Sequence, residues 1–285
     1  MNYKAKAAVV LKALCVWWGI FLILGCCAGF CIKVLFGLFF VSGNRFTISL
    51  GQYIPIMIAG AFVLAVAAYL ISMLVHKAPI RRLRKKLDAI YTESGVSKEY
   101  IELLCSNCRG DIKNPLYVEL ASAYAINGSF NEAKATLDRI DIISVLDIAQ
   151  STGNFCTAAY YYAAAVIIYM KQDKPELAAA AYNNGSFYLN ELAEDSYIAA
   201  VKGLYLHSIG KDDEARSALD TAKHWKLSNF AGKVYWGCTL TMKAVLLKAL
   251  GNTDLAVLAA RQALDCKLTP FLEEQLGTVL RRQQA

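Results

Sequence analysis

The sequence predicts an all-α protein in which a two-helix transmembrane hairpin is followed by an array of helix–turn–helix repeats. Residues 1–76 contain no acidic residue and hold two long apolar runs. The ten residues from 77 to 86 then carry six Lys or Arg side chains. The rest of the chain is rich in Ala, Leu, Glu and Lys and has no alternating β-branched run, which is typical of helices.

The first element is the hairpin, residues 1–76, with spans at about 13–41 and 54–75. About 20 apolar residues cross a hydrocarbon core of ~30 Å, so each run is long enough. Lys and Arg flank the outer ends of both runs, which predicts that the N- and C-termini are cytoplasmic. We therefore expect a multi-pass protein of the plasma or inner membrane. A cleaved signal peptide is the alternative, but the first run continues well past the length of a signal core.

A basic juxtamembrane segment, residues 77–113, is predicted next. Pro79 and Gly95 bound an expected amphipathic helix at 80–93. Six cations are expected to meet anionic lipid headgroups at the membrane surface: Lys77, Arg81, Arg82, Arg84, Lys85 and Lys86. After residue 86 acidic residues outnumber basic ones, which argues against a nucleic-acid partner.

The repeat domain, residues 114–285, contains four segments with one helix–turn–helix pattern. The predicted turn residues are 45, 37 and 41 positions apart: Gly128, Asp173, Gly210 and Gly251. An alanine stands five residues after each turn, where it lets the paired helices approach closely: Ala133, Ala178, Ala215 and Ala256. A left-handed residue, usually glycine, commonly ends a helix. Helix starts are predicted from Pro115, Pro175 and Pro270, and capping boxes from Ser129 with Glu132 and from Asp173 with Glu176.

This pattern resembles the tetratricopeptide repeat, W-x2-L-G-x2-Y…A-x3-F. The first segment matches it best, at Tyr117, Leu120, Tyr124, Ala133 and Leu137. The spacings exceed 34 residues, and Lys202 and Lys243 replace an expected Leu. The resemblance covers about residues 114–264 and implies an α-solenoid with a concave groove; a generic helical bundle is the alternative. The layout is also similar to membrane-anchored repeat proteins linked to bacterial haem biosynthesis, which suggests a bacterial inner membrane.

The resemblance implies a non-enzymatic scaffold that binds a protein or peptide partner in the groove and needs no cofactor. Mapping the repeat onto this chain places seven residues on the groove side: Ser122, Tyr160, Lys171, Tyr197, His207, Thr241 and Lys248. Tyr and Lys side chains there suit an acidic-aromatic segment. Val118 and Ser122 stand where the family's carboxylate clamp has its first Lys and Asn, so a chaperone C-terminus is not the expected ligand.

Two further features leave alternatives open. Gly25 and Gly29 form a GxxxG step through which the chain could dimerise. Cys105 and Cys108 form a lone C-x-x-C, so a helical membrane-bound regulator or a redox or metal-responsive protein is the alternative function. A zinc site needs two more ligands, and no second C-x-x-C exists. No phosphate-binding loop, H-E-x-x-H or G-x-S-x-G motif is present, so we expect neither an enzyme nor a metal site.

Overall fold

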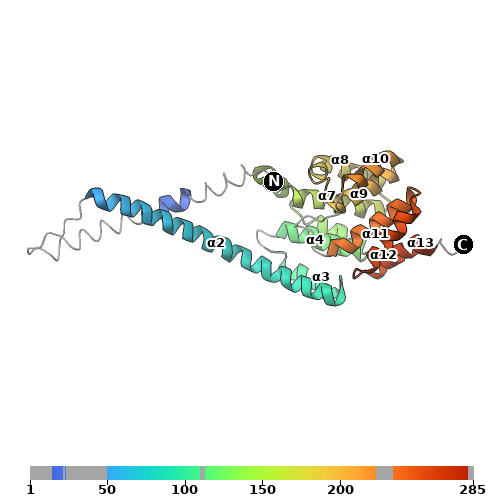
Figure 1. The fold of residues 1–285 in the computed structure, drawn as a ribbon, viewed down its shortest axis with the longest axis horizontal. Helices are drawn as coiled ribbons and strands as arrows, with labels where there is room; N and C mark the ends of the chain where they lie inside the picture. The colour runs from blue at the N-terminus through green and yellow to red at the C-terminus, as the bar shows by residue number, and fades with distance from the viewer. Residues whose placement is uncertain (1–14, 22, 24–49, 110–112, 223–233, 282–285) are drawn as a thin grey trace, which may run out of the picture. The chain divides into compact units, whose positions relative to one another are not determined.

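The computed structural model describes residues 15–21, 23, 50–109, 113–222 and 234–281 (Figure 1). The chain forms two compact units, Met1–Leu83 and Arg84–Ala285. The regular secondary structure in the described ranges is helical, so the all-α prediction is confirmed.

The transmembrane hairpin is a wrong prediction. Among the residues that the structure describes, no helix is both long and apolar enough to span a membrane. This finding overturns the predicted span at 54–75, the multi-pass localisation and the membrane assignment. Residues 15–21 and 23 are the described part of the first run, and they are helical. The rest of that run, with Gly25 and Gly29, lies outside the described residues.

The second apolar run belongs to one long helix, α2, which spans Leu50–Ser94. Its backbone stays helical through Pro79, where we expected a boundary, so the separate helix 80–93 is also a wrong prediction. A proline removes only one N–H from the helical ladder, and helix on both sides supplies the other bonds. Gly95 ends α2 as expected, with a φ of +68°. The sequence thus predicted an apolar span and a separate basic helix, whereas the backbone forms one continuous helix.

The second unit holds the repeats and two helices that precede or interrupt them. Its helices, after the end of α2, are α3 (Lys98–Asn107), α4 (Lys113–Ile126), α5 (Phe130–Leu137), α6 (Ile142–Thr152), α7 (Cys156–Lys171), α8 (Pro175–Glu191), α9 (Ser196–Ser208), α10 (Asp212–Thr221), α11 (Val234–Ala249), α12 (Thr253–Leu264) and α13 (Pro270–Leu280). Four tightly packed pairs recur, α4–α5, α7–α8, α9–α10 and α11–α12. We call α4, α7, α9 and α11 the first helices and their partners the second helices. Each first helix packs beside the next one, and α13 packs beside α11.

The four predicted turns share one backbone geometry. Gly128, Asp173, Gly210 and Gly251 have φ values of +78°, +56°, +77° and +80°. The amide after each turn residue donates to the carbonyl five positions earlier, as in Ser129 to Tyr124 at 2.9 Å and Asn252 to Leu247 at 2.8 Å. This is the longer hydrogen bond of the Schellman motif. The predicted turns are therefore confirmed, and Asp173 takes the left-handed conformation that the other three turns give to glycine.

The four predicted alanines are confirmed at close helix contacts. Ala133, Ala178, Ala215 and Ala256 are each at most 1 % exposed. In the third pair, a Cβ added to Gly203 would lie 3.4 Å from the Ala215 carbonyl oxygen and 2.5 Å from Leu246. Small residues on both helices therefore set how closely α9 and α10 approach.

The two predicted capping boxes are wrong. Ser129 precedes α5, but its side chain caps no amide, and the residue before α8 is Lys174 rather than Asp173. Ser129 and Lys174 have ψ values of 67° and 69°, because both belong to the Schellman turns. The side chains of Ser97 and Thr269 do cap their helices, and their backbones are extended, with ψ values of 171° and 157°. The tight turn thus prevents the capping geometry that the sequence suggested.

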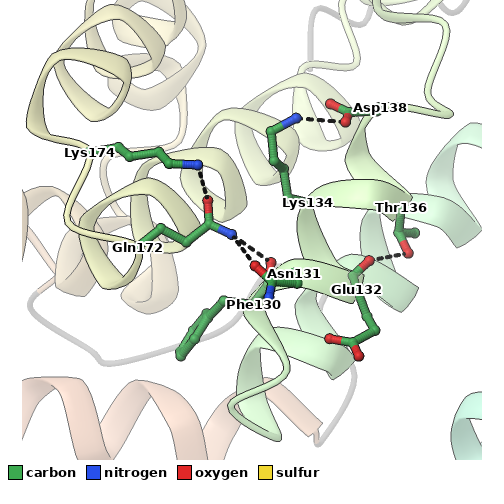
Figure 2. Close-up of polar contacts among 8 residues, drawn as sticks. All are labelled: Phe130, Asn131, Glu132, Lys134, Thr136, Asp138, Gln172 and Lys174. Carbon is green, nitrogen blue, oxygen red and sulfur yellow. Dashed lines mark hydrogen bonds and ion pairs between the residues drawn. The ribbon is translucent and has the colours of Figure 1, made fainter.

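Figure 2 shows how the first pair joins the second. The Gln172 side-chain amide donates to the Phe130 carbonyl at 3.2 Å and to Asn131 Oδ1 at 3.1 Å, and Lys174 donates to Gln172 at 3.3 Å. The turn between α7 and α8 therefore holds the start of α5. This contact fixes Phe130 at the position where α13 begins.

The segment before α13 returns to the first repeat. Thr269 Oγ1 donates to the Ile126 carbonyl at 2.6 Å, across 143 residues of sequence. The Tyr91 hydroxyl, at the end of α2, donates to the Lys267 carbonyl at 3.4 Å. The start of α13, the last described helix, therefore contacts the first helix pair.

Candidate functional site

A small cavity lies between the first helices and α13. Its volume is about 60 Å³, and all four first helices contribute to its wall. Ser122 comes from α4, Lys171 from α7, Tyr197 from α9 and Met242 from α11, while Gln275 comes from α13. The lining is mainly apolar, and the charged side chain among these residues is that of Lys171. We refer to this cavity and the α13-facing surface around it as the groove.

Three tyrosines lie beneath the groove. The rings of Tyr160 and Tyr197 stack at 5.2 Å, and Tyr235 meets both edge-on at 5.2 and 4.9 Å. The Tyr160 hydroxyl donates to Asp195 at 2.9 Å, and the same carboxylate caps α9 by accepting from the Tyr197 and Ile198 amides. Burial raises the pKa of Tyr197 well above its usual value. The three rings pack against one another, and we call them the tyrosine floor of the groove.

Ser122 and Thr241 bond to their own helices. Ser122 Oγ donates to the Val118 carbonyl at 3.0 Å, and Thr241 Oγ1 donates to the Gly237 carbonyl at 2.9 Å. Both side chains are buried. Ser122 lines the groove, whereas Thr241 is not among the lining residues.

Lys171 stands at the mouth of the groove. Its ammonium group lies 5.9 Å from the centre of the Phe271 ring of α13, within cation–π range. Partial burial lowers the pKa of Lys171. A cation that is partly removed from water and faces an aromatic ring suits an aromatic or acidic group from a partner.

His207 and Lys248 make other contacts. His207 Nδ1 lies 2.7 Å from Asp212 Oδ1, which ties α9 to α10. The Lys248 ammonium donates to the carbonyls of Thr278 and Val279, at the last turn of α13. The structure therefore brings Ser122, Lys171 and Tyr197 together around the groove with Tyr160 below. Thr241, His207 and Lys248 do not line the cavity.

Residues of α13 complete the groove, and the sequence prediction did not assign them to it. The Phe271 ring meets Phe130 edge-on at 5.4 Å, and a Cβ at Gly128 would lie 3.1 Å from that ring. The predicted start at Pro270 is confirmed. Apolar residues at 271, 272, 276 and 279 lie on one face of a helix. This pattern could have predicted that α13 packs against the repeats.

One predicted membrane-surface cation has a different role. Arg84 forms an ion pair with Glu119 of α4 at 2.6 Å, and Tyr100 of α3 donates to the same carboxylate at 2.8 Å. Glu119 is only 2 % exposed. Burial opposes the charge of Arg84, but the Glu119 carboxylate raises the Arg84 pKa overall. The pair anchors the end of α2 to the first repeat.

The other predicted surface cations differ from Arg84. The side chains of Arg81, Arg82, Lys85 and Lys86 are exposed, and that of Lys77 lies outside the described residues. None of these four enters a described ion pair with an acidic side chain.

The C-x-x-C pair shows no sign of an activated thiol. Cys105 is exposed, while Cys108 is buried and its Sγ donates to the Leu104 carbonyl at 3.2 Å. Burial raises the pKa of Cys108 to about 12, so it stays protonated at neutral pH. A reactive or metal-binding cysteine instead needs a lowered pKa. Within the described ranges, no three His, Cys, Asp or Glu side chains are grouped as metal ligands.

Comparison of this chain with protein-family models, curated proteins and solved structures finds no match. The functional argument therefore starts from the geometry of the groove. The resemblance to tetratricopeptide repeats stays a prediction from the sequence.

Proposed function

We propose that the second unit is a non-enzymatic protein-interaction module that binds a segment of a partner protein in the groove. The observation that carries this proposal is the shared wall of the groove, to which all four first helices contribute. Each repeat supplies one part of a single surface, as helical arrays do when they bind an extended or helical segment.

The chemistry of the groove favours a mainly apolar segment. Met242, Val245 and Ile167 offer aliphatic or thioether contacts, and the tyrosine floor holds the wall in place. Lys171 would select an aromatic or acidic group at the mouth, because its ammonium is already partly desolvated and faces a ring. Buried aromatic and apolar contacts usually supply most of the binding energy of an interface.

The alternative redox or metal function has less support. The buried Cys108 thiol is held protonated, and its Sγ already donates to a carbonyl oxygen. No observation favours a catalytic role for the pair, so we propose only the binding function.

Site-specific photocrosslinking in the full-length chain tests the proposal. A photoreactive residue replaces Lys171 at the mouth of the groove. In a matched control it replaces Leu258, which is 53 % exposed on α12. We expect a discrete crosslinked protein from position 171 only, and its loss when Phe130→Ala is added. Crosslinks from position 258 alone would move the binding site to the second helices and contradict the proposal.

A further inference from the structure

We propose that α13 occupies the partner's place in the groove, and that the partner segment is itself an amphipathic helix that displaces α13. This inference rests on the proposed function and names the partner class for the same site. α13 packs against α11 and α12 and closes the groove with Phe271, Leu272 and Gln275.

The N-terminal end of α13 is held by a cap and a ring. Thr269 Oγ1 donates to the Ile126 carbonyl at 2.6 Å and accepts from the Leu272 amide at 3.4 Å. The Phe271 ring then rests against Phe130. Because the groove supplies a carbonyl and an aromatic surface here, it suits any helix that begins with a hydroxyl cap and an early aromatic residue.

The C-terminal end of α13 is held through its main chain. The Lys248 ammonium donates to the main-chain carbonyls of Thr278 and Val279, in the last turn of α13. This contact does not depend on the side chains of the bound helix. The Ile126 carbonyl and Lys248 therefore contact the two ends of α13, a helix of 11 residues. The Lys248 contact does not select the sequence of that helix.

The fit of α13 is incomplete between these ends. Leu272, Leu276 and Val279 are buried, and Leu276 and Val279 join the core around α11 and α12. Gln275, however, is a polar residue in a cavity lining that is mainly apolar and includes Met242 and Val245. An apolar side chain at this position would contribute hydrophobic energy that glutamine does not. A partner helix with such a residue should therefore outcompete α13.

One face of α13 packs against α11 and α12. The opposite face of α13 is polar, with Glu273 and Glu274 exposed. The partner class is thus an amphipathic helix with a capping Ser or Thr and an early aromatic residue. Aliphatic residues should follow at the positions equivalent to 272, 275, 276 and 279.

Peptide binding to the full-length chain tests this inference. The probes are labelled peptides of residues 268–281, one with the native sequence and one with Gln275→Met. Methionine has nearly the shape of glutamine and adapts to irregular cavities. Fluorescence anisotropy measures the affinity of each peptide for the wild-type chain, for Phe271→Ala and for a Leu258→Ala control.

We expect the native peptide to bind the wild type weakly, because α13 competes for the same place. Phe271→Ala weakens that competition without changing the wall that the first helices form, so both peptides should bind this variant at least tenfold more tightly. The Gln275→Met peptide should bind several-fold more tightly than the native one, and Leu258→Ala should behave as wild type. Thr269→Ala loosens α13 by a different contact and should give the same gain even if Phe271→Ala does not fold.

Equal binding to the wild type and the loosened variants, or no binding to any of them, would overturn the inference. The photocrosslinking experiment separates this failure from failure of the proposed function. A partner captured at position 171 whose yield the peptides do not reduce would leave the interaction module in place and reject α13 as its competitor.

Discussion

The first and second helices of the repeats differ in what they bury. The first helices hold large side chains, including the tyrosines at 160, 197 and 235 and the carboxylate of Glu119. The second helices meet them through alanines and expose apolar residues outward, such as Leu177, Phe187, Leu255 and Leu258. Most groove positions inferred from the repeat pattern therefore belong to the core. The part of the first helices that lines the cavity faces α13, and we expect a ligand to contact the protein there.

The largest effect is expected from removing Arg84, the cation that pairs with the buried Glu119 carboxylate of a first helix. Arg84→Ala leaves Glu119 buried without its cation, and we expect a loss of about 3 kcal/mol in unfolding free energy. Lys85→Ala, at an exposed neighbouring position, should change it by less than about 0.5 kcal/mol. Urea unfolding of the two variants compares them. Similar small losses would mean that the ion pair does not anchor α2.

Alkaline pH should weaken the first-helix layer through Cys238, which lies on α11 and lines the groove. Burial raises its pKa from 9 to about 12. The folded state therefore holds the proton more tightly than the unfolded state, and this contribution is complete below pH 9. It is lost as the pH rises toward 12, by a few kcal/mol at about 1.4 kcal/mol per pKa unit. Cys238→Ala should flatten the decline between pH 9 and 12, measured by urea unfolding; an unchanged slope would contradict the burial of this thiol.

The contact between first and second helices is tested by overpacking. Ala215→Leu places a larger side chain against α9, and we expect destabilisation by about 1–3 kcal/mol. Ser217→Leu on the exposed side of α10 is the matched control and should have an effect within about 0.5 kcal/mol. The thermal midpoint of the full chain checks both. A midpoint unchanged by Ala215→Leu would reject the register of the third pair.

A smaller effect with opposite signs is expected at the turns. Gly210→Ala forces an alanine into a left-handed residue and should cost about 1 kcal/mol. Asp173→Gly relieves that cost at the one of the four repeat turns that lacks glycine, and it should be neutral or slightly stabilising. Chemical denaturation of both variants distinguishes them. A loss from Asp173→Gly as large as that from Gly210→Ala would show that the Asp173 side chain, rather than its backbone conformation, stabilises the turn.

The features that the sequence predicted well are local. The left-handed turns and the alanines five residues later follow from short-range backbone geometry, and the structure confirms them. The capping boxes failed because the Schellman turn changes ψ at Ser129. The groove was only partly predictable, because the Thr269–Ile126 bond joins residues 143 positions apart. The hairpin failed because no described helix is both long and apolar enough to cross a membrane, although the second apolar run does lie within the helix α2.

Hydrogen exchange of α13 tests the central claim most directly. The full-length chain is incubated with a saturating amount of the Gln275→Met peptide, and the protection of the 270–280 amides is compared with that of α11. We predict that the peptide accelerates exchange throughout α13 while α11 stays protected, because α13 leaves the groove without unfolding the array. Exchange of α13 at the same rate as α11, with or without the peptide, would show that α13 is a permanent part of the core and contradict the account.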